Sequence, residues 1–219
     1  MILGIDTSLG TAVAVIEPDG VVRAEADSAD PRGHAEVIGT LIAQALAEAS
    51  ASPSDVTHVA AGMGPGPFTG LRVGIAAARA FGLGGDHGRG VPVVPVVSHD
   101  AVALALLLGD VLRDVETPRF AVVTDARRRE FAYTVYDGLD DDGLPVRAAE
   151  PALAPRDEID AVLAGLGAER RDAAHVPAAM IALVAARALD AGRAIAPTDA
   201  LYLRSPDVTL AVAPKRVIA

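Results

Sequence analysis

An acidic residue followed by two hydroxyl residues, Asp6-Thr7-Ser8, ends the first apolar run of the chain. At the end of a strand, a carboxylate and two hydroxyls can meet a phosphate group or a magnesium ion. The same residue types at a turn commonly bond their own backbone instead. We favour the turn interpretation and keep the phosphate interpretation as the alternative.

A glycine-rich loop is the second stretch with chemical potential: Gly62-Met63-Gly64-Pro65-Gly66-Pro67-Phe68-Thr69-Gly70. Its glycines and prolines allow a sharp reversal that presents main-chain N–H groups at the start of a helix. Such a loop can cradle an anion. It is not a Walker A loop, which needs a lysine directly after its glycines, because Lys215 is the only lysine.

The run Ser98-His99-Asp100 has the residue types of a catalytic triad. Consecutive residues on a helix point about 100° apart, whereas the side chains of a triad must converge. We therefore interpret Ser98 as the cap of a helix whose body runs from Ala101 to about Leu112.

Other catalytic or metal chemistry finds little support in the sequence. There are no cysteines, and the five histidines never fall four apart on one helix. The neighbouring carboxylates Asp140-Asp141-Asp142 lie in a turn without apolar surroundings that would raise a pKa. We expect no catalytic residue, metal site or bound cofactor made by this chain alone.

The charge balance bears on nucleic acid binding. A net charge of −10 argues against binding by the isolated chain, because phosphate contacts need clustered Lys and Arg. Arg127-Arg128-Arg129 is the obvious exception. We interpret it as a solvated turn, with a small patch that touches RNA as the alternative.

The composition predicts a globular protein outside the membrane. The chain has 219 residues, of which 51% are hydrophobic, and this is enough for a sizeable core. Apolar runs such as 101–108 are far shorter than the roughly 20 residues that span a bilayer. The start at Met1 reads as a strand rather than a signal peptide, so we expect a cytoplasmic protein.

The elements that must position these residues begin with three strands joined by tight turns, which predict an antiparallel meander. A helix, a parallel strand, a second helix and a proline-containing edge strand follow. The expected ranges are 2–7, 11–17, 21–26, 34–50, 57–61, 70–83 and 91–97. The first lobe, residues 1–98, thus reads βββαβαβ.

A second βββα pattern indicates a duplicated domain over residues 99–219. Its strands are expected at 120–124, at 131–136 and around Val146, and its helix at 156–163. Residues 165–176 look too polar and short for a further strand, so we expect a reduced second lobe. A helix over 177–191 and a short strand or docking segment at Leu201 to Arg204 follow, and the tail 206–219 is expected to be loose or bound to a partner.

Both helices of the first lobe carry a row of small residues four apart. A helical glycine costs roughly 1 kcal/mol relative to alanine, so this spacing needs a structural reason. Close contact with another helix backbone is such a reason, and the two helices could pack on each other, on the sheet or on another subunit. The rows are Gly70, Gly74, Ala78 and Gly82 in one helix, and Gly39, Ala43 and Ala47 in the other.

Several motifs together resemble the TsaB (YeaZ-type) family. They are Ile5-Asp6-Thr7-Ser8, Pro31-Arg32-Gly33-His34, the loop from Gly64 to Gly74, Asp125-Ala126-Arg127 and Tyr202-Leu203-Arg204. They occur in the family's order over most of the chain. The resemblance implies an α/β protein with the duplicated fold of actin, Hsp70 and sugar kinases, each lobe being ribonuclease H-like.

The resemblance also implies a non-catalytic scaffold subunit of the bacterial machinery that places a threonylcarbamoyl group on N6 of the adenosine beside the tRNA anticodon. It implies that the chain binds the catalytic subunit TsaD and that the ATPase TsaE joins this complex. It also implies that the chain contacts tRNA only as part of the complex and that it forms a homodimer in isolation. In family members the first two helices form the interface with the partner subunit. The expected partner-binding residues are accordingly His34, Ile38, Gly39, Leu41, Ala43, Ala47, Gly70, Leu71, Gly74, Ile75, Ala78 and Gly82.

Two departures from the family pattern matter. The second lobe lacks the usual strand with a Gly-Asp-Gly-like turn, which lowers the odds of ATP binding, and Pro67 stands where serine is more common. One alternative function is a free-standing actin-like ATPase or kinase that uses Asp6 and the glycine-rich loop. A peptidase is another, and the absence of the histidine pair of the catalytic relative counts against it.

Overall fold

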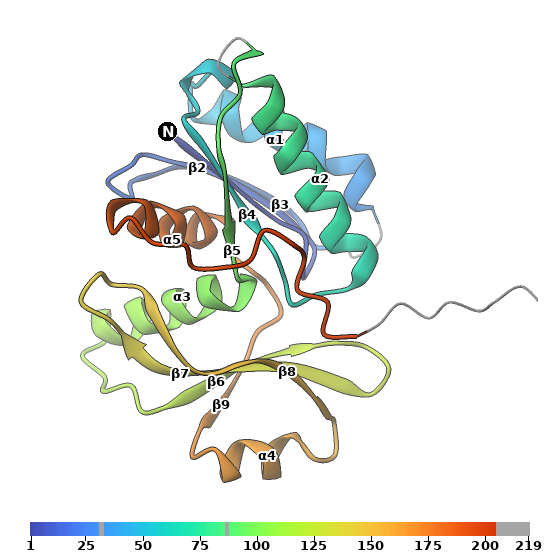
Figure 1. The fold of residues 1–219 in the computed structure, drawn as a ribbon, viewed down its shortest axis with the longest axis vertical. Helices are drawn as coiled ribbons and strands as arrows, with labels where there is room; N and C mark the ends of the chain where they lie inside the picture. Colours follow the sequence, from blue (N-terminus) through green and yellow to red (C-terminus); the bar gives the residue numbers. More distant parts are fainter. Residues whose placement is uncertain (31–32, 86–87, 205–219) are drawn as a thin grey trace, which may run out of the picture.

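The chain alternates layers of helices and sheets, as a computed structural model shows for residues 1–30, 33–85 and 88–204. From top to bottom of Figure 1 the layers are α1 with α2, a first sheet, α5 with α3, a second sheet, and α4. The elements are β1 (Ile2–Asp6), β2 (Thr11–Ile16), β3 (Val22–Ser28), α1 (His34–Glu48), the 3₁₀ turn η1 (Pro53–Asp55), β4 (His58–Gly62), α2 (Phe68–Gly84), β5 (Val93–Val96), α3 (Ser98–Leu112), β6 (Phe120–Asp125), β7 (Glu130–Leu139), β8 (Pro145–Pro155), α4 (Ile159–Gly165), β9 (Glu169–Asp172) and α5 (Ala178–Asp190).

The first sheet has the strand order β3-β2-β1-β4-β5. β1 pairs with β2 antiparallel, Ile2 opposite Ile16, and with β4 parallel, Ile2 opposite His58. β5 lies at the edge, where the missing N–H of Pro95 costs no ladder bond on the open side. The βββαβαβ order and the edge position of the last strand are confirmed.

β1 is buried on both faces, which explains its uninterrupted apolar sequence. Leu3 and Ile5 belong to the core beneath α1 and α2, whereas Ile2 belongs to the core that α3 and α5 share with the second sheet. Gly4 lies directly against α5, where an added Cβ would be 2.3 Å from the Ala178 carbonyl oxygen. The central strand therefore has no side that faces solvent.

The second sheet has the order β8-β7-β6-β9, with β6 antiparallel to β7 and parallel to β9. The expectation that residues 165–176 hold no strand is wrong, because Glu169 to Asp172 form β9. This strand is polar because it lies at the sheet edge and its arginines have partners. Arg170 binds Asp160 and Asp172 and lies over the ring of Phe131.

The two lobes repeat the βββα plan, so the duplicated actin-like fold implied by the resemblance is confirmed, with five strands in the first sheet and four in the second. The helix of the second βββα unit, α4, begins at Ile159 rather than at the expected Arg156. No helix of the described residues is long and apolar enough to cross a membrane. Pro31 and Arg32 of the resemblance, His87 and the tail 206–219 lie outside those residues.

Candidate functional site

Asp6 lies at the end of β1 and points into the protein rather than into a cleft. Only 2% of the residue is exposed. One carboxylate oxygen accepts the Ser8 N–H at 2.7 Å, and the other accepts the Ser98 hydroxyl at 2.5 Å and the Ser8 hydroxyl at 3.2 Å. Burial raises the pKa of Asp6 to about 6, against the lowering effect of these hydrogen bonds. Asp6 thus bonds the backbone of its own turn, as the turn interpretation expects, whereas the hydroxyls of Thr7 and Ser8 bond Gly70 and Ser98.

The interpretation of Ser98 as a helix cap is wrong. Val97 precedes α3 as its N-cap, and Ser98 is the first helical residue. Its hydroxyl binds Asp6 and accepts the Gly64 N–H at 3.1 Å, while its own N–H donates to the Gly64 carbonyl at 2.7 Å. The side chain therefore joins the end of β1 to the glycine-rich loop, a contact across the fold that no local pattern could reveal.

His99 and Asp100 point away from Ser98, so the three residues form no triad. The His99 ring lies between the hydroxyls of Thr134 and Thr124, at 2.7 and 2.9 Å. Because the ring is fully buried, the pKa of His99 falls to about 3 and the ring stays neutral. His99 is therefore a structural residue that ties α3 to the second sheet.

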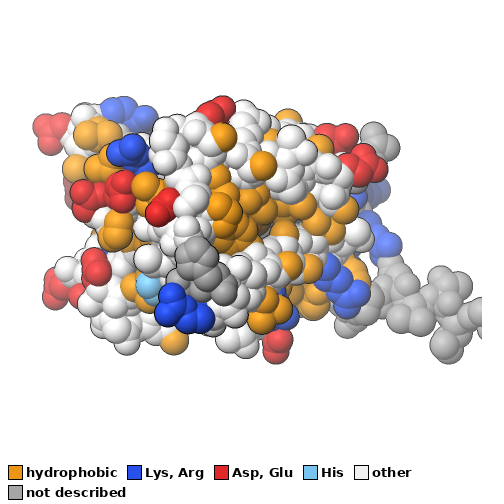
Figure 2. Space-filling view, turned by 90° about the horizontal axis from the view of Figure 1, so that it is seen from above, with side chains coloured by type: hydrophobic (Ala, Val, Ile, Leu, Met, Phe, Trp, Pro, Cys, Tyr) orange, Lys and Arg blue, Asp and Glu red, His pale blue; other side chains and the backbone are white. Residues whose placement is uncertain are grey.

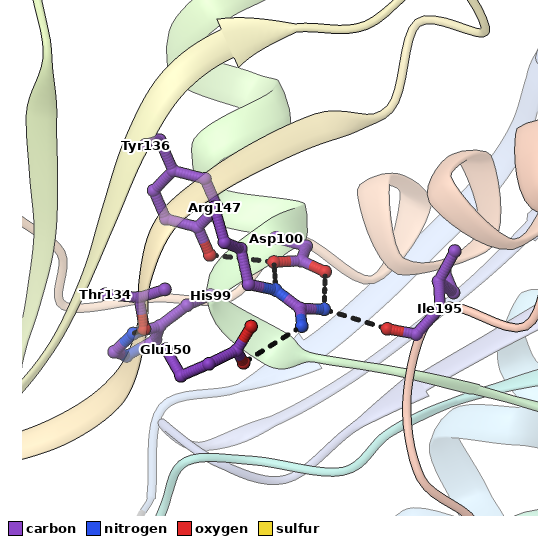
Figure 3. A network of polar contacts seen from close by, with 7 residues as sticks. All are labelled: His99, Asp100, Thr134, Tyr136, Arg147, Glu150 and Ile195. Atoms are coloured by element: carbon purple, nitrogen blue, oxygen red, sulfur yellow. Dashed lines mark hydrogen bonds and ion pairs between the residues drawn. The ribbon is translucent and has the colours of Figure 1, made fainter.

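A buried ion pair completes this link between α3 and the second sheet (Figure 3). Two nitrogens of Arg147 donate to the Asp100 carboxylate at 2.8 and 2.5 Å, and the Tyr136 hydroxyl donates to it at 2.8 Å. Arg147 also donates to the Ile195 carbonyl at 2.9 Å and to Glu150 at 3.2 Å. The network joins a helix start, two strands and the segment after α5.

The small-residue row of α2 packs inside this chain, mainly on the sheet, and only Gly70 at its start also approaches the other helix, α1, at His34. A Cβ on Gly74 would lie 2.2 Å from the Thr7 hydroxyl oxygen, and one on Gly70 would lie 2.7 Å from the Thr7 carbonyl. A Cβ on Gly82 would meet Val93 at 2.9 Å. The row exists because α2 lies almost in contact with the end of β1 and with β5.

Most of the expected partner-binding residues are likewise buried within the chain. Only three are exposed, and they form the row on α1: Gly39, Ala43 and Ala47. A Cβ on Gly39 would meet nothing within 4 Å. The other nine have little or no surface to offer a partner in this conformation: His34, Ile38, Leu41, Gly70, Leu71, Gly74, Ile75, Ala78 and Gly82.

An apolar surface nevertheless covers both helices. Partly exposed side chains from α1 and α2 cover the core beneath them, and Leu83 of α2 is 79% exposed. Figure 2 looks down on this layer and shows hydrophobic side chains gathered in a band across its middle. We name it the α1–α2 face, and its residues are Val37, Gly39, Ile42, Ala43, Ala47, Val73, Ala77, Phe81 and Leu83.

Six residues of this face are not in the expected set: Val37, Ile42, Val73, Ala77, Phe81 and Leu83. Their spacing carried a usable signal, since Val73, Ala77 and Phe81 recur every four residues beside the glycine row. Residues next to the fully buried face of an amphipathic helix are only partly covered. The partly exposed apolar row of α2 therefore lies one residue before the buried glycine row in the sequence.

A cleft of about 440 Å³ opens between the two lobes. The glycine-rich loop and the start of α2 line one side, the turn between β6 and β7 lines the other, and Tyr202 to Arg204 close one end. Of the two expected forms, this segment is a docking segment rather than a strand. Leu201 N–H donates to the Met63 carbonyl at 2.7 Å, the Tyr202 ring packs against the Phe68 ring at a tilt of 37°, and Arg204 pairs with Glu130.

The described part of the chain holds no group of three or more His, Cys, Asp or Glu side chains arranged to bind a metal ion. The acid nearest the cleft, Asp125, accepts the Arg127 N–H at 2.7 Å and pairs with Arg156 at 2.6 Å. These hydrogen bonds, led by that from Arg156, hold the pKa of Asp125 below its usual value. The cleft is thus lined by apolar and cationic groups around one carboxylate that is already paired.

Comparison with known protein families gives one match over most of the chain. The family described as "TsaD: tRNA N6-adenosine threonylcarbamoyltransferase" matches residues 17–154. An uncharacterized protein of Mycobacterium tuberculosis is 42% identical over 161 residues, 70% of each chain. A tRNA N6-adenosine threonylcarbamoyltransferase of Streptococcus pneumoniae is 37% identical over 102 residues, which are 47% of this chain and only 28% of that enzyme.

Among solved structures, YeaZ from Pseudomonas aeruginosa has the same fold. The TM-score is 0.72, and the match covers 92% of this chain and 99% of that one at 24% sequence identity. A second Pseudomonas aeruginosa structure, described as having similarity to peptidase YEAZ, gives a TM-score of 0.71. Because identity is low, this likeness concerns the fold.

Proposed function

The chain belongs to the family of TsaD, the tRNA N6-adenosine threonylcarbamoyltransferase, and from this membership we propose that it is a TsaB-type, non-catalytic scaffold subunit. Its role is to support threonylcarbamoyl transfer to N6 of the adenosine next to the tRNA anticodon. The catalytic partner is a TsaD-type subunit, a TsaE-type ATPase joins the complex, and tRNA is met through that complex in the cytoplasm. Alone, the chain forms a homodimer.

One observation carries this proposal: the α1–α2 face is apolar and open. Leu83 leaves 79% of its surface in solvent, and the exposed row Gly39, Ala43 and Ala47 lets a partner helix approach the α1 backbone closely. Contiguous exposed apolar surface of this kind marks protein interaction sites. Glu36, Gln44 and Glu48 are exposed polar residues on the same helix, and interfaces commonly combine apolar and polar residues in this way.

The alternative, an ATPase or kinase that uses Asp6, has weaker support. In nucleotide hydrolysis a carboxylate must hold a metal ion or orient a water molecule near the phosphates. Both oxygens of Asp6 are instead hydrogen-bonded to Ser8 and Ser98 inside the protein. Gly66, in the loop that would cradle a phosphate, packs against Ser8, where a Cβ would lie 2.8 Å from the Ser8 Cα.

The test is copurification with a TsaD-type subunit from the same organism. We expect Ala43→Glu and Ala47→Glu to abolish it, because each places a carboxylate in the apolar contact. Ala161→Glu and Ala164→Glu make the same change at exposed positions on α4, in the opposite outer layer, and should have no effect. Light scattering of the isolated chain should show the same two variants, and not the controls, as monomers.

Retention of the partner by both α1 variants would refute the proposed interface. Mg-ATP discriminates the alternative function, since a ligand at a hundredfold excess over its Kd stabilises the folded state by about 2.7 kcal/mol. We expect no such shift in melting temperature for the isolated chain. A shift that Asp6→Asn removes would favour the ATPase.

A further inference from the structure

The turn between β6 and β7 presents three arginines in an unusual backbone conformation. Arg127, Arg128 and Arg129 have φ angles of 63°, 49° and 64°, and all three are exposed. Residues with side chains rarely adopt such angles, and a run of three is rarer still. Hydrogen bonds from the Ala126 and Glu130 N–H groups close the turn. The fold thus holds three neighbouring cations at the mouth of the interlobe cleft.

The two carboxylates that flank the turn in the sequence pair with arginines outside it. Asp125 pairs with Arg156 at 2.6 Å, and Glu130 pairs with Arg204. Arg127, Arg128 and Arg204 line the cleft together with one acid, Asp125, so arginines outnumber carboxylates in its lining on a chain whose net charge is −10.

Aromatic rings lie across the same cleft. Phe68 and Tyr202 both line it, and their ring centroids are 4.6 Å apart. The Arg72 guanidinium lies 3.7 Å from the centre of the Phe68 ring and donates to the Tyr202 hydroxyl at 3.0 Å. Tyr202 keeps 39% of its surface exposed. Stacked aromatic and guanidinium planes are the surfaces on which proteins hold unstacked bases.

We infer that the cleft mouth binds a single-stranded segment of RNA. Arg127, Arg128 and Arg129 contact successive phosphates, and a base stacks on the exposed face of Tyr202. An acidic protein segment would also meet the arginines, but it would make no use of the aromatic plane. We identify the RNA bound in the cell as tRNA, and this identification rests on the proposed function, which places the chain beside the modified adenosine. The surface itself does not depend on the α1–α2 face.

The experiment measures binding of a fluorescent RNA hairpin with an unpaired loop to the complex of the chain with its TsaD-type partner. Arg127→Gly with Arg129→Gly removes two charges and suits the left-handed turn, so the variant cannot fail through misfolding of the turn. We expect about tenfold weaker binding and a salt dependence shallower by roughly 0.7 per lost contact. Tyr202→Leu should weaken binding without changing that dependence.

The matched control is Arg23→Gln with Arg193→Gln, which removes two exposed charges far from the turn. If the control weakens RNA binding as much as the glycine variant, or if neither changes it, the inference is wrong. Poly-glutamate should compete poorly with the labelled RNA. If it competes as well as unlabelled RNA does, and if Tyr202→Leu has no effect, the ligand of the cleft mouth is an acidic protein segment and not RNA. Copurification with the TsaD-type subunit should be unchanged in all of these arginine and tyrosine variants. Its loss in Ala43→Glu and Ala47→Glu tests the proposed function separately.

Discussion

Single residues in this protein are constrained by how closely backbones approach, and glycine positions show it best. Gly39 and Gly74 both lie in helices and both belong to rows of small residues. A Cβ on Gly74 would lie 2.2 Å from the Thr7 hydroxyl oxygen, whereas one on Gly39 would meet nothing within 4 Å. The same residue type therefore serves two purposes, internal packing in α2 and an open surface on α1.

The two glycines predict opposite effects of the same substitution. We expect Gly74→Ala to lower the free energy of unfolding by about 1–3 kcal/mol, because the new methyl group overpacks the contact with Thr7. We expect Gly39→Ala to raise it by up to about 1 kcal/mol, because alanine favours the helix. Urea unfolding of the two variants checks this. Equal effects of both substitutions would contradict the packing described for α2.

Asp6 predicts a pH dependence of stability. Its pKa is raised from 3.8 to about 6 by burial, so the folded state binds the proton more tightly than the unfolded state. The stabilisation from this group is therefore present at low pH and is lost as pH rises from about 4 to about 6, by an amount on the order of 2–3 kcal/mol. Above that range the contribution is constant.

Replacing Asp6 by Asn should remove this pH dependence, since the amide does not titrate and Ser98 can accept its N–H. Urea unfolding between pH 4 and 7 measures the difference from the wild type. Asp19→Asn changes an exposed aspartate and serves as the control. A parallel pH profile for wild type and Asp6→Asn would mean that Asp6 titrates at the same pH in the folded and unfolded states.

At the scale of elements, the lobes are joined by polar contacts as well as by apolar packing. Asp100 at the start of α3 is 3% exposed and depends on Arg147 of β8 for its charge partner. Burial raises the pKa of Asp100 despite this partner. Loss of the guanidinium would therefore leave a buried carboxyl group without its main hydrogen-bond donor.

We expect Arg147→Met to lower the free energy of unfolding by about 3–5 kcal/mol, the usual result of removing one partner of a buried pair. Arg119→Met breaks the exposed pair with Asp137 and should cost less than about 1 kcal/mol. Combining Arg147→Met with Asp100→Leu should restore part of the loss. Thermal unfolding measures all three, and similar losses for the two arginine variants would contradict the buried role of Arg147.

Elements with a strong periodic pattern could be predicted from the sequence, and elements held by distant contacts could not. The strands of the first sheet and α1 follow directly from apolar spacing. β9 was missed because Arg170 and Arg171 read as polar, and only the folded structure supplies the acids that pair with them. The row on α2 was recognised, but small residues permit close contact with a strand end as readily as with a helix.

Across the whole molecule, the two candidate surfaces lie on different parts of the fold. The α1–α2 face covers the first outer layer (Figure 2), whereas the arginine turn and Tyr202 lie at the cleft between lobes. The segment 198–204 connects them, since Arg79 of α2 donates to the Thr198 carbonyl at 2.7 Å and Arg204 pairs with Glu130 of β7. A partner on α2 and a strand in the cleft could be bound together.

The position of α5 has a consequence for synthesis on the ribosome. β1 is made first, yet the helix that covers it at Gly4 begins only at Ala178. Contacts between residues so distant in sequence form slowly and late. While translation continues, the nascent first sheet has one apolar face without its cover, a state that favours aggregation. We therefore expect the emerging chain to need protection by a chaperone until α5 has left the exit tunnel.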